Sequence, residues 1–231
     1  MQTSGRFPGP HQGEQVVEAG APLHRARVAM ILVHGRGADA QSMIPLADEL
    51  AQPDAAYLAP QAAGNTWYPH SFLAPIEQNE PGLSSGLQAI DDVRRQIEAA
   101  GISADRTVVL GFSQGACLGL EYVARNPRLY GGVVAFSGGL IGNGRRSDAE
   151  PPDDKLFDYD GSLRGTPVFL GCSDIDSHIP IQRVRQSAEV MEGLNGSVTT
   201  KIYAGMGHTI NQDEISFVRR LLAELVGGAA G

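Results

Sequence analysis

The sequence predicts an α/β fold, in which a mostly parallel, doubly wound sheet is flanked by helices. The first observation behind this prediction is that short apolar runs typical of buried strands alternate with longer segments of helical periodicity. The second is that the runs in the middle of the chain are apolar throughout, as in parallel strands covered on both faces. The third is length, because 231 residues bury one sizeable core and require no second domain.

The expected elements follow in chain order. Strands are placed at residues 15–20, 27–33, 56–59, 107–110, 132–137, 166–171 and 199–203, and helices at residues 42–50, 83–100, 116–124, 182–194 and 212–226. A turn containing Gly and Pro joins the first two strands, of which the second is the more apolar. In the helix at 83–100, apolar residues recur every three or four positions and Gly101 follows as a C-cap. The next helix stops at Asn126-Pro127, where a proline cannot continue it.

Composition shifts divide the chain. Residues 1–13 are rich in Gly and Pro and are expected to form a flexible extension, followed by a single domain over residues 14–231 with little or no lid. Residues 148–160 are acidic and contain two prolines, which indicates a long surface connection between two strands. Nothing further in the sequence supports a protein partner on this connection.

Bulk properties exclude several function classes. Acidic residues outnumber basic ones by 26 to 18 and the longest basic run is Arg145-Arg146, so the sequence lacks the basic patch of a nucleic-acid-binding protein. Cys117 and Cys172 have no metal or redox spacing and fit a reducing cytoplasm better than a disulfide framework. The N-terminus lacks the apolar core of a signal peptide, and no apolar run reaches membrane-spanning length. We therefore expect a cytoplasmic protein without integral membrane association.

The pentapeptide Gly-Phe-Ser-Gln-Gly at residues 111–115 joins an apolar strand directly to a helix. This pattern is typical of a nucleophile elbow, a sharp turn that holds a serine hydroxyl where a base reaches its proton and the helix N-terminus stabilises negative charge. Glycines two residues to either side leave room for the turn. Ser113 is the predicted nucleophile, and the alternative is that it only caps the helix.

A hydrolytic serine needs a base and an acid that orients the base. In a sheet of this kind both lie in loops after later strands, and along the chain the serine comes first, then the acid and then the histidine. Of the six histidines, His208 has the expected position, between the last strand and the last helix. The acid is expected in the loop at residues 171–180, which also follows a buried strand. Asp174 and Asp176 both qualify there by position.

Acyl transfer also needs two backbone N–H groups that stabilise an oxyanion, one from the residue after the nucleophile and one from a loop after an earlier strand. Gln114 supplies the first. The Gly-rich turn at residues 34–38 follows an early buried strand, so the N–H of Arg36 is the expected second donor. A phosphate-binding loop is the competing interpretation of this turn, but the required Lys-Ser/Thr and the longer glycine pattern are missing.

The segment 64–72 contains the only tryptophan of the chain, Trp67, next to Tyr68. These aromatic residues either wall an acyl pocket and bind substrate or anchor a long loop to the core. The Arg36 side chain either pairs with an anionic group of the substrate or is solvated. The sequence does not decide between the two roles of the aromatic residues or between the two roles of Arg36.

Together, His-Gly-Arg-Gly at 34–37, Gly-Phe-Ser-Gln-Gly-Ala at 111–116, Asp-x-Asp-x-x-x-Pro at 174–180 and Gly-Met-Gly-His at 205–208 resemble the phospholipase/carboxylesterase family of α/β-hydrolases. The resemblance spans about residues 28–226 and points to the bacterial esterase branch of that family, which also includes acyl-protein thioesterases. It implies the α/β-hydrolase fold and selects Asp176, the second aspartate of its motif, as the acid.

The predicted function is therefore a serine carboxylesterase that hydrolyses esters of short to medium acyl chain through Ser113, His208 and Asp176. Acyl-protein thioesterase or lysophospholipase activity is the alternative, and a catalytically silent hydrolase-fold binding protein is a third. Arg36 stands where many relatives carry an apolar residue, so a preference for long lipid-like chains is not carried over. The predicted partner is a small-molecule ester or thioester, with no metal and no organic cofactor. Relatives often form dimers, which makes a homodimer an expectation from the resemblance alone.

Overall fold

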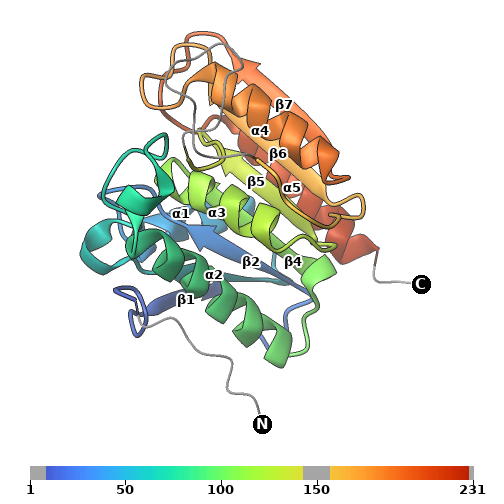
Figure 1. Ribbon diagram of the computed structural model, residues 1–231. Coiled ribbons are helices and arrows are strands. Elements are labelled where there is room, and N and C mark those ends of the chain that lie inside the picture. Colours follow the sequence, from blue (N-terminus) through green and yellow to red (C-terminus); the bar gives the residue numbers. More distant parts are fainter. Residues whose placement is uncertain (1–8, 143–156, 229–231) are drawn as a thin grey trace.

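The computed structural model of the protein describes residues 9–142 and 157–228. Within them one sheet runs through the molecule with strands in the order β1-β3-β2-β4-β5-β6-β7 (Figure 1). The strands are β1 (Val16–Gly20), β2 (Val28–Val33), β3 (Ala55–Pro60), β4 (Thr107–Phe112), β5 (Gly132–Phe136), β6 (Pro167–Ser173) and β7 (Ser197–Tyr203). The α-helices are α1 (Ile44–Leu50), α2 (Gly82–Ala99), α3 (Gln114–Arg125), α4 (Ile181–Gly193) and α5 (Gln212–Gly227).

The predicted sheet and its helices are confirmed, with ends that differ from the expected ones by a few residues. All neighbouring strands are parallel except β1, which is antiparallel to β3. β1 therefore does not pair with β2, the strand that follows it in the chain. The reason is that β2 lies inside the sheet between β3 and β4, where every one of its residues is buried.

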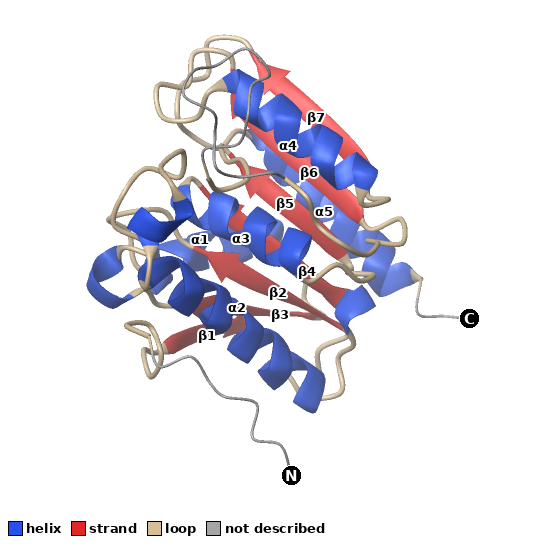
Figure 2. Ribbon diagram, in the orientation of Figure 1, coloured by secondary structure: helices blue, strands red, loops and turns tan. Residues whose placement is uncertain are grey.

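Helices cover both faces of the sheet and divide the core into two layers. α2, α3 and α4 lie on one face and α1 and α5 on the other (Figure 2). The first layer includes Ile90, Leu118 and Val184, and the second includes Leu50 and Val218, all of them buried. This covering explains why the central strands are apolar on both faces, because neither face meets water.

The described part of the N-terminal segment is attached to the domain. Residues 1–8 lie outside the described residues, but His11 is only 4% exposed. Its backbone N–H donates to Ser85 Oγ at 2.9 Å, and its ring joins the carbonyl oxygen of Trp67 to the N–H of Ala63 at 2.9 and 3.0 Å. The expectation of a flexible extension over residues 1–13 thus differs from the structure at residues 9–13, because composition does not reveal these buried hydrogen bonds. Most of the acidic connection 148–160 lies outside the described residues.

The order and direction of the strands create a crevice at the edge of the sheet where the parallel strands end. The order of the strands reverses between β2 and β4, since β3 lies beyond β2 on one side and β5, β6 and β7 follow β4 on the other. Loops that leave the carboxyl ends of two such strands diverge and open a crevice, which is where ligands bind in open α/β sheets. The loops after β2, β4, β6 and β7 all meet at this edge.

Candidate active site

Ser113 occupies a sharp turn between β4 and α3. Its backbone has φ 55° and ψ −121°, a conformation that side-chain-bearing residues adopt rarely, and the residue makes no side-chain cap of the helix. A Cβ on Gly111 would lie 2.3 Å from the carbonyl oxygen of Gly115, and a Cβ on Gly115 would lie 2.1 Å from that of Val33. Only glycine fits these two positions, so the turn pattern expected from residues 111–115 is present.

A hydrogen-bonded chain joins three side chains from the ends of three strands. Ser113 Oγ lies 2.9 Å from His208 Nε2, and His208 Nδ1 lies 2.7 Å from Asp176 Oδ2. Ser113 follows β4, Asp176 follows β6 and His208 follows β7. Because His208 donates its Nδ1–H in a hydrogen bond to the Asp176 carboxylate, its Nε2 atom is left as the acceptor for the Ser113 hydroxyl.

The two candidate aspartates have different partners. The side chain of Asp176 is fully buried, and its Oδ1 accepts the backbone N–H groups of His178 and Ile179 at 2.8 and 3.1 Å. Asp174 is exposed, and its Oδ1 accepts the N–H of Gly205 at 2.8 Å. The aspartate that the family resemblance selects is thus the one in contact with His208, while Asp174 fastens the loop that carries His208.

Opposing effects act on the pKa of Asp176. Burial raises it, but the hydrogen bond from His208 and those from the backbone of His178 and Ile179 outweigh burial and leave the pKa below its ordinary value. The carboxylate therefore stays charged at neutral pH. A charged carboxylate at this position favours a proton on the Nδ1 atom of His208.

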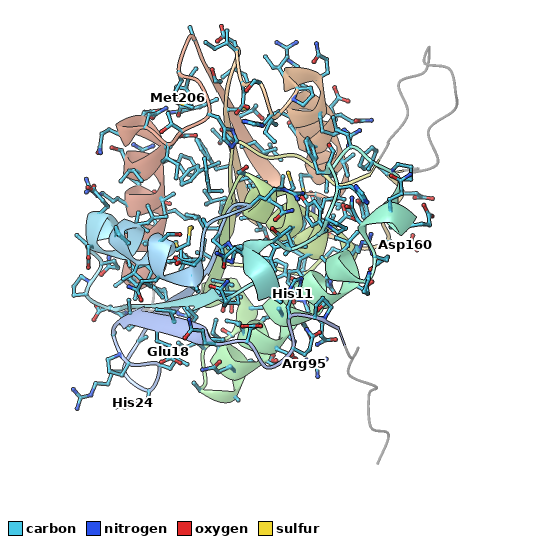
Figure 3. All side chains as sticks on the ribbon, turned by 90° about the vertical axis from the view of Figure 1, so that its left-hand side faces the viewer. His11, Glu18, His24, Arg95, Asp160 and Met206 are labelled. Carbon is cyan, nitrogen blue, oxygen red and sulfur yellow. The ribbon has the colours of Figure 1, made fainter. Side chains whose placement is uncertain are left out.

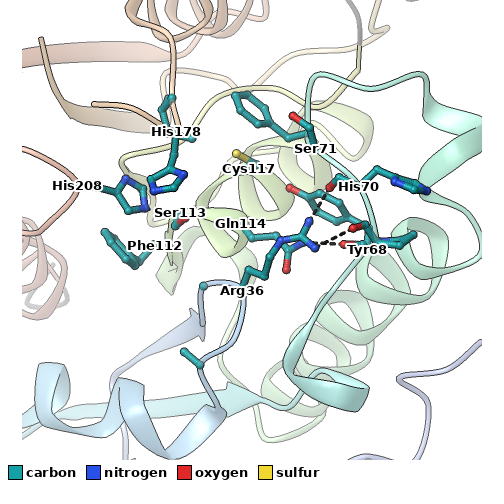
Figure 4. A pocket seen from close by; sticks show the side chains of 15 residues that line it. Arg36, Tyr68, His70, Ser71, Phe112, Ser113, Gln114, Cys117, His178 and His208 are labelled. Carbon is teal, nitrogen blue, oxygen red and sulfur yellow. Dashed lines mark hydrogen bonds between the residues drawn. The ribbon is translucent and has the colours of Figure 1, made fainter. Parts of the chain in front are cut away.

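Two aromatic rings pack against the ring of His208. The centroid of Phe112 lies 4.9 Å from that of His208, and the centroid of His178 lies 4.7 Å from it. Figure 4 shows His178 and Phe112 grouped with His208 at one end of the pocket. Neither was singled out as a site residue from the sequence, although Phe112 is the variable residue before the elbow serine and His178 belongs to the acid loop.

The two expected oxyanion donors lie where the crevice opens. Gln114 begins α3, Arg36 lies in the loop after β2, and neither backbone N–H has a hydrogen-bond acceptor among the described residues. The Gln114 side chain accepts the N–H of Trp67 at 2.9 Å and donates to the carbonyl oxygen of Tyr68 at 2.8 Å. Gln114 therefore ties the aromatic segment 64–72 to the elbow.

A pocket of about 520 Å³ opens over Ser113 (Figure 4). The residues that line it are Gly35, Arg36, Ala38, Tyr68, Pro69, His70, Ser71, Phe72, Phe112, Ser113, Gln114, Cys117, His178, Ile179 and His208. Tyr68, for which substrate binding is one of the two alternatives considered, is among them.

Trp67 anchors its loop to the core, which is the second of the two roles considered for it. It is fully buried, does not line the pocket, and donates its indole N–H to the carbonyl oxygen of His34 at 2.9 Å. Its ring packs against those of His11 and His34, with centroids 5.3 and 4.9 Å away. Trp67 is an anchor of the loop and not a wall of the pocket, because its ring and its indole N–H contact His11 and His34, which are far from it in the sequence.

Cys117 and Cys172 are buried and unpaired. In the part of the chain that the structure describes, no group of three His, Cys, Asp or Glu side chains is arranged to hold a metal ion. None of the helices described is both long and apolar enough to cross a membrane.

A doubly wound sheet with a serine, a histidine and a carboxylate in contact at its carboxyl edge defines the class of serine hydrolases with the α/β-hydrolase fold. Comparison with known proteins leads further. Residues 12–226 match the phospholipase/carboxylesterase family, and the chain belongs to that family.

A solved structure and two curated relatives illustrate the similarity. The crystal structure of a phospholipase/carboxylesterase from Dyadobacter fermentans superposes with a TM-score of 0.84 at 40% identity, over 95% of this chain and all of that one. Acyl-protein thioesterase 1 of Gibberella zeae is 31% identical over 145 residues, which are 63% of this chain and 59% of the relative. Acyl-protein thioesterase 1 of Saccharomyces cerevisiae is 27% identical over 88% of this chain and 96% of the relative.

The matches to the first three curated relatives span only 51–59% of the length of those proteins. Their whole activities are therefore not assigned to this chain by the match itself.

Proposed function

We propose that the protein is a serine carboxylesterase that cleaves esters of short to medium acyl chain through a triad of Ser113, His208 and Asp176. The observation that carries the proposal is the unbroken chain of two hydrogen bonds, 2.9 Å from Ser113 to His208 and 2.7 Å from His208 to Asp176. Distances in this range suit proton transfer from a nucleophile to a general base.

In the proposed reaction His208 Nε2 takes the proton of the Ser113 hydroxyl as the oxygen attacks the ester carbonyl. The N–H groups of Arg36 and Gln114 stabilise the negative charge on the former carbonyl oxygen. His208 then gives the proton to the departing alcohol, which leaves an acyl group on Ser113. Water attacks this acyl-enzyme with His208 again as the base, releasing a carboxylic acid and restoring the serine.

The pocket supports short to medium acyl chains. Its volume of about 520 Å³ lies in the lower half of the range of roughly 300–1,000 Å³ for ligand pockets. The side chains of Arg36, His70, Ser71 and His178 bring polar groups to its lining. A long alkyl chain would have to lie against these polar groups as well as against the apolar part of the lining, which favours the shorter substrates.

The test is hydrolysis of 4-nitrophenyl esters from acetyl to palmitoyl by the wild type, Ser113→Ala and Ser216→Ala, in which the last variant changes a serine outside the pocket. We expect turnover with the highest kcat/KM at acyl chains of up to about eight carbons, lost by at least about 10³-fold in Ser113→Ala and unchanged in Ser216→Ala. Equal rates in wild type and Ser113→Ala on every ester would reject the proposal and leave a binding protein with a hydrolase fold.

Acyl-protein thioesterase or lysophospholipase activity is the second candidate, supported by the two relatives named acyl-protein thioesterase 1. An enzyme of this kind would gain kcat/KM as the chain lengthens towards palmitoyl. The same ester series therefore separates the two candidates.

The location and assembly of the protein belong to the same proposal. Two buried, unpaired cysteines support a reducing, cytoplasmic environment. A homodimer follows only from the behaviour of relatives, and light scattering of the purified protein would give its mass directly.

A further inference from the structure

The charges around the pocket differ from those of the whole chain. The protein carries a net charge of −8, yet the residues that line the pocket include Arg36 and three histidines and no aspartate or glutamate. Charged groups close to a binding site decide which ligand charge is favoured, so this lining favours a ligand with a negative charge.

Arg36 is the fixed positive charge of this lining. Its guanidinium donates to the carbonyl oxygens of Pro69 and His70 at 2.8 and 2.5 Å, and it lies 5.9 Å from the centre of the Tyr68 ring. No carboxylate of the described residues pairs with it, and the neighbouring Asp39 instead accepts the N–H of Ser42. A guanidinium carries five N–H donors, so several remain for a ligand after two carbonyl contacts. The charge is thus held in place and exposed, and no described carboxylate serves as its counter-ion.

The position of Arg36 decides which half of an ester would meet it. His208 must give its proton to the departing alcohol, so the alcohol lies on the side of His208 and His178. Figure 4 shows Arg36, Tyr68 and His70 on the opposite side of Ser113. The acyl half of the ester therefore extends towards Arg36.

We propose that Arg36 selects esters whose acyl group ends in a carboxylate, that is, half-esters of short dicarboxylic acids. This inference rests on the proposed esterase function and specifies its substrate class. An arginine fork binds a carboxylate through two parallel hydrogen bonds, which gives direction as well as attraction. The two carbonyl contacts hold the side chain in position before the substrate arrives, which lowers the entropy lost on binding.

The experiment compares two matched substrates that differ only in charge: the mono-4-nitrophenyl ester of adipic acid and the corresponding ester with a terminal carboxamide. Hydrolysis by Ser113→Ala is subtracted as background. We expect wild type to prefer the carboxylate by about tenfold in kcat/KM, mostly through KM, and we expect the preference to shrink in 0.5 M salt as screening increases.

Four variants locate the preference. Arg36→Met should abolish it, whereas Arg36→Lys should retain part of it, because lysine keeps the charge without the fork. Arg25→Met removes an exposed positive charge from the turn between β1 and β2 and should leave the preference unchanged. Figure 3 shows the neighbouring His24 at the far end of the molecule from Met206, which lies in the His208 loop. His178→Leu should also leave the preference in place.

The ratio of the two substrates separates charge recognition from loop support. If Arg36 only held the loop at residues 69–70, its replacement would lower both rates equally and leave the ratio unchanged, which would overturn the inference. Equal use of both substrates by wild type, or loss of the preference in His178→Leu but not in Arg36→Met, would overturn it as well. In each of these cases turnover of the carboxamide ester would still support the esterase proposal, whereas no Ser113-dependent turnover of either ester would reject both.

Discussion

The two sides of the pocket hold their side chains in different ways. On the base side, formed by residues 173–180 and 204–214, half-exposed loops are fixed by a few hydrogen bonds to carboxylates, such as those of Asp176. On the acyl side, formed by residues 34–38 and 61–72 and the start of α3, the polar side chains His34, Gln61 and Gln114 are buried and bind the backbone of neighbouring segments. In the proposed function, the base side transfers the proton and the acyl side provides a firmly held pocket wall.

The largest expected effect is a loss of kcat when the base side is altered in a protein that stays folded. Asp176→Asn should lower kcat by about 10³- to 10⁴-fold, because an amide no longer favours the required tautomer of His208. The thermal midpoint should change little. Steady-state kinetics on a short 4-nitrophenyl ester and calorimetry measure the two quantities.

Asp174→Asn is the matched control for that variant. The asparagine oxygen still accepts the N–H of Gly205, so kcat should fall by less than about tenfold. An inactive Asp174→Asn beside an active Asp176→Asn would transfer the role of the acid to Asp174.

The second effect concerns the acyl side and should appear mainly in stability. Gln114→Leu leaves the N–H of Trp67 and the carbonyl oxygen of Tyr68 buried without their partner, at a cost of about 2–4 kcal/mol in the free energy of unfolding. Urea unfolding measures this loss. Gln96→Leu on the exposed face of α2 is the control and should change stability by less than about 0.5 kcal/mol. Similar losses in the two variants would mean that the buried network adds nothing.

The third effect depends on pH and concerns Glu214, in the first turn of α5. Burial raises its pKa to about 7, and its Oε1 has no hydrogen-bond partner among the described residues. Since the pKa is higher in the folded state, the protonated carboxyl stabilises the fold fully below about pH 4.5, and this contribution is lost as the pH rises through about 7.

Glu214→Gln should therefore raise the free energy of unfolding at pH 8 by up to about 3 kcal/mol and change it little at pH 4.5. Glutamine keeps an oxygen that accepts the N–H of Asn211, so the start of the helix is preserved. Urea unfolding at the two pH values measures the difference. A stability change of the same size at both would show that Glu214 is not protonated in the folded protein.

The smallest effect sharpens the distinction between anchor and pocket wall. Trp67→Phe removes the indole N–H that the His34 carbonyl accepts and should lower the free energy of unfolding by about 1–2 kcal/mol. The acyl-chain-length profile should keep its maximum, because Trp67 does not line the pocket. A shifted maximum would return Trp67 to the acyl wall.

The sheet, and the edge of it where the site residues meet, could be predicted from the sequence because they depend on local patterns. Apolar runs and helical periodicity identified the strands and helices, and the glycines at 111 and 115 identified a turn that no other residue fits. The position of His208 next to Ser113 could be predicted because the ends of parallel strands meet at one edge, whatever the details of the loops.

Other features depend on contacts between distant residues. Asp174 and Asp176 share a loop, and position along the chain does not separate them. The family resemblance selected Asp176, and the fold of the loop brings that residue to His208. The roles of Trp67 and of residues 9–13 depend on each other, since His11 binds the backbone of Trp67 and packs against its ring. Neither is visible in composition or periodicity.

The separation of the site residues along the chain has a consequence for how the protein is handled. Ser113 and His208 are 95 residues apart and come from opposite ends of the run β4 to β7. The hydroxyl meets its imidazole only after the intervening strands have assembled in register. Under the proposed function, labelling of Ser113 by a fluorophosphonate would therefore count correctly assembled molecules, and active-site titration would measure the refolding yield.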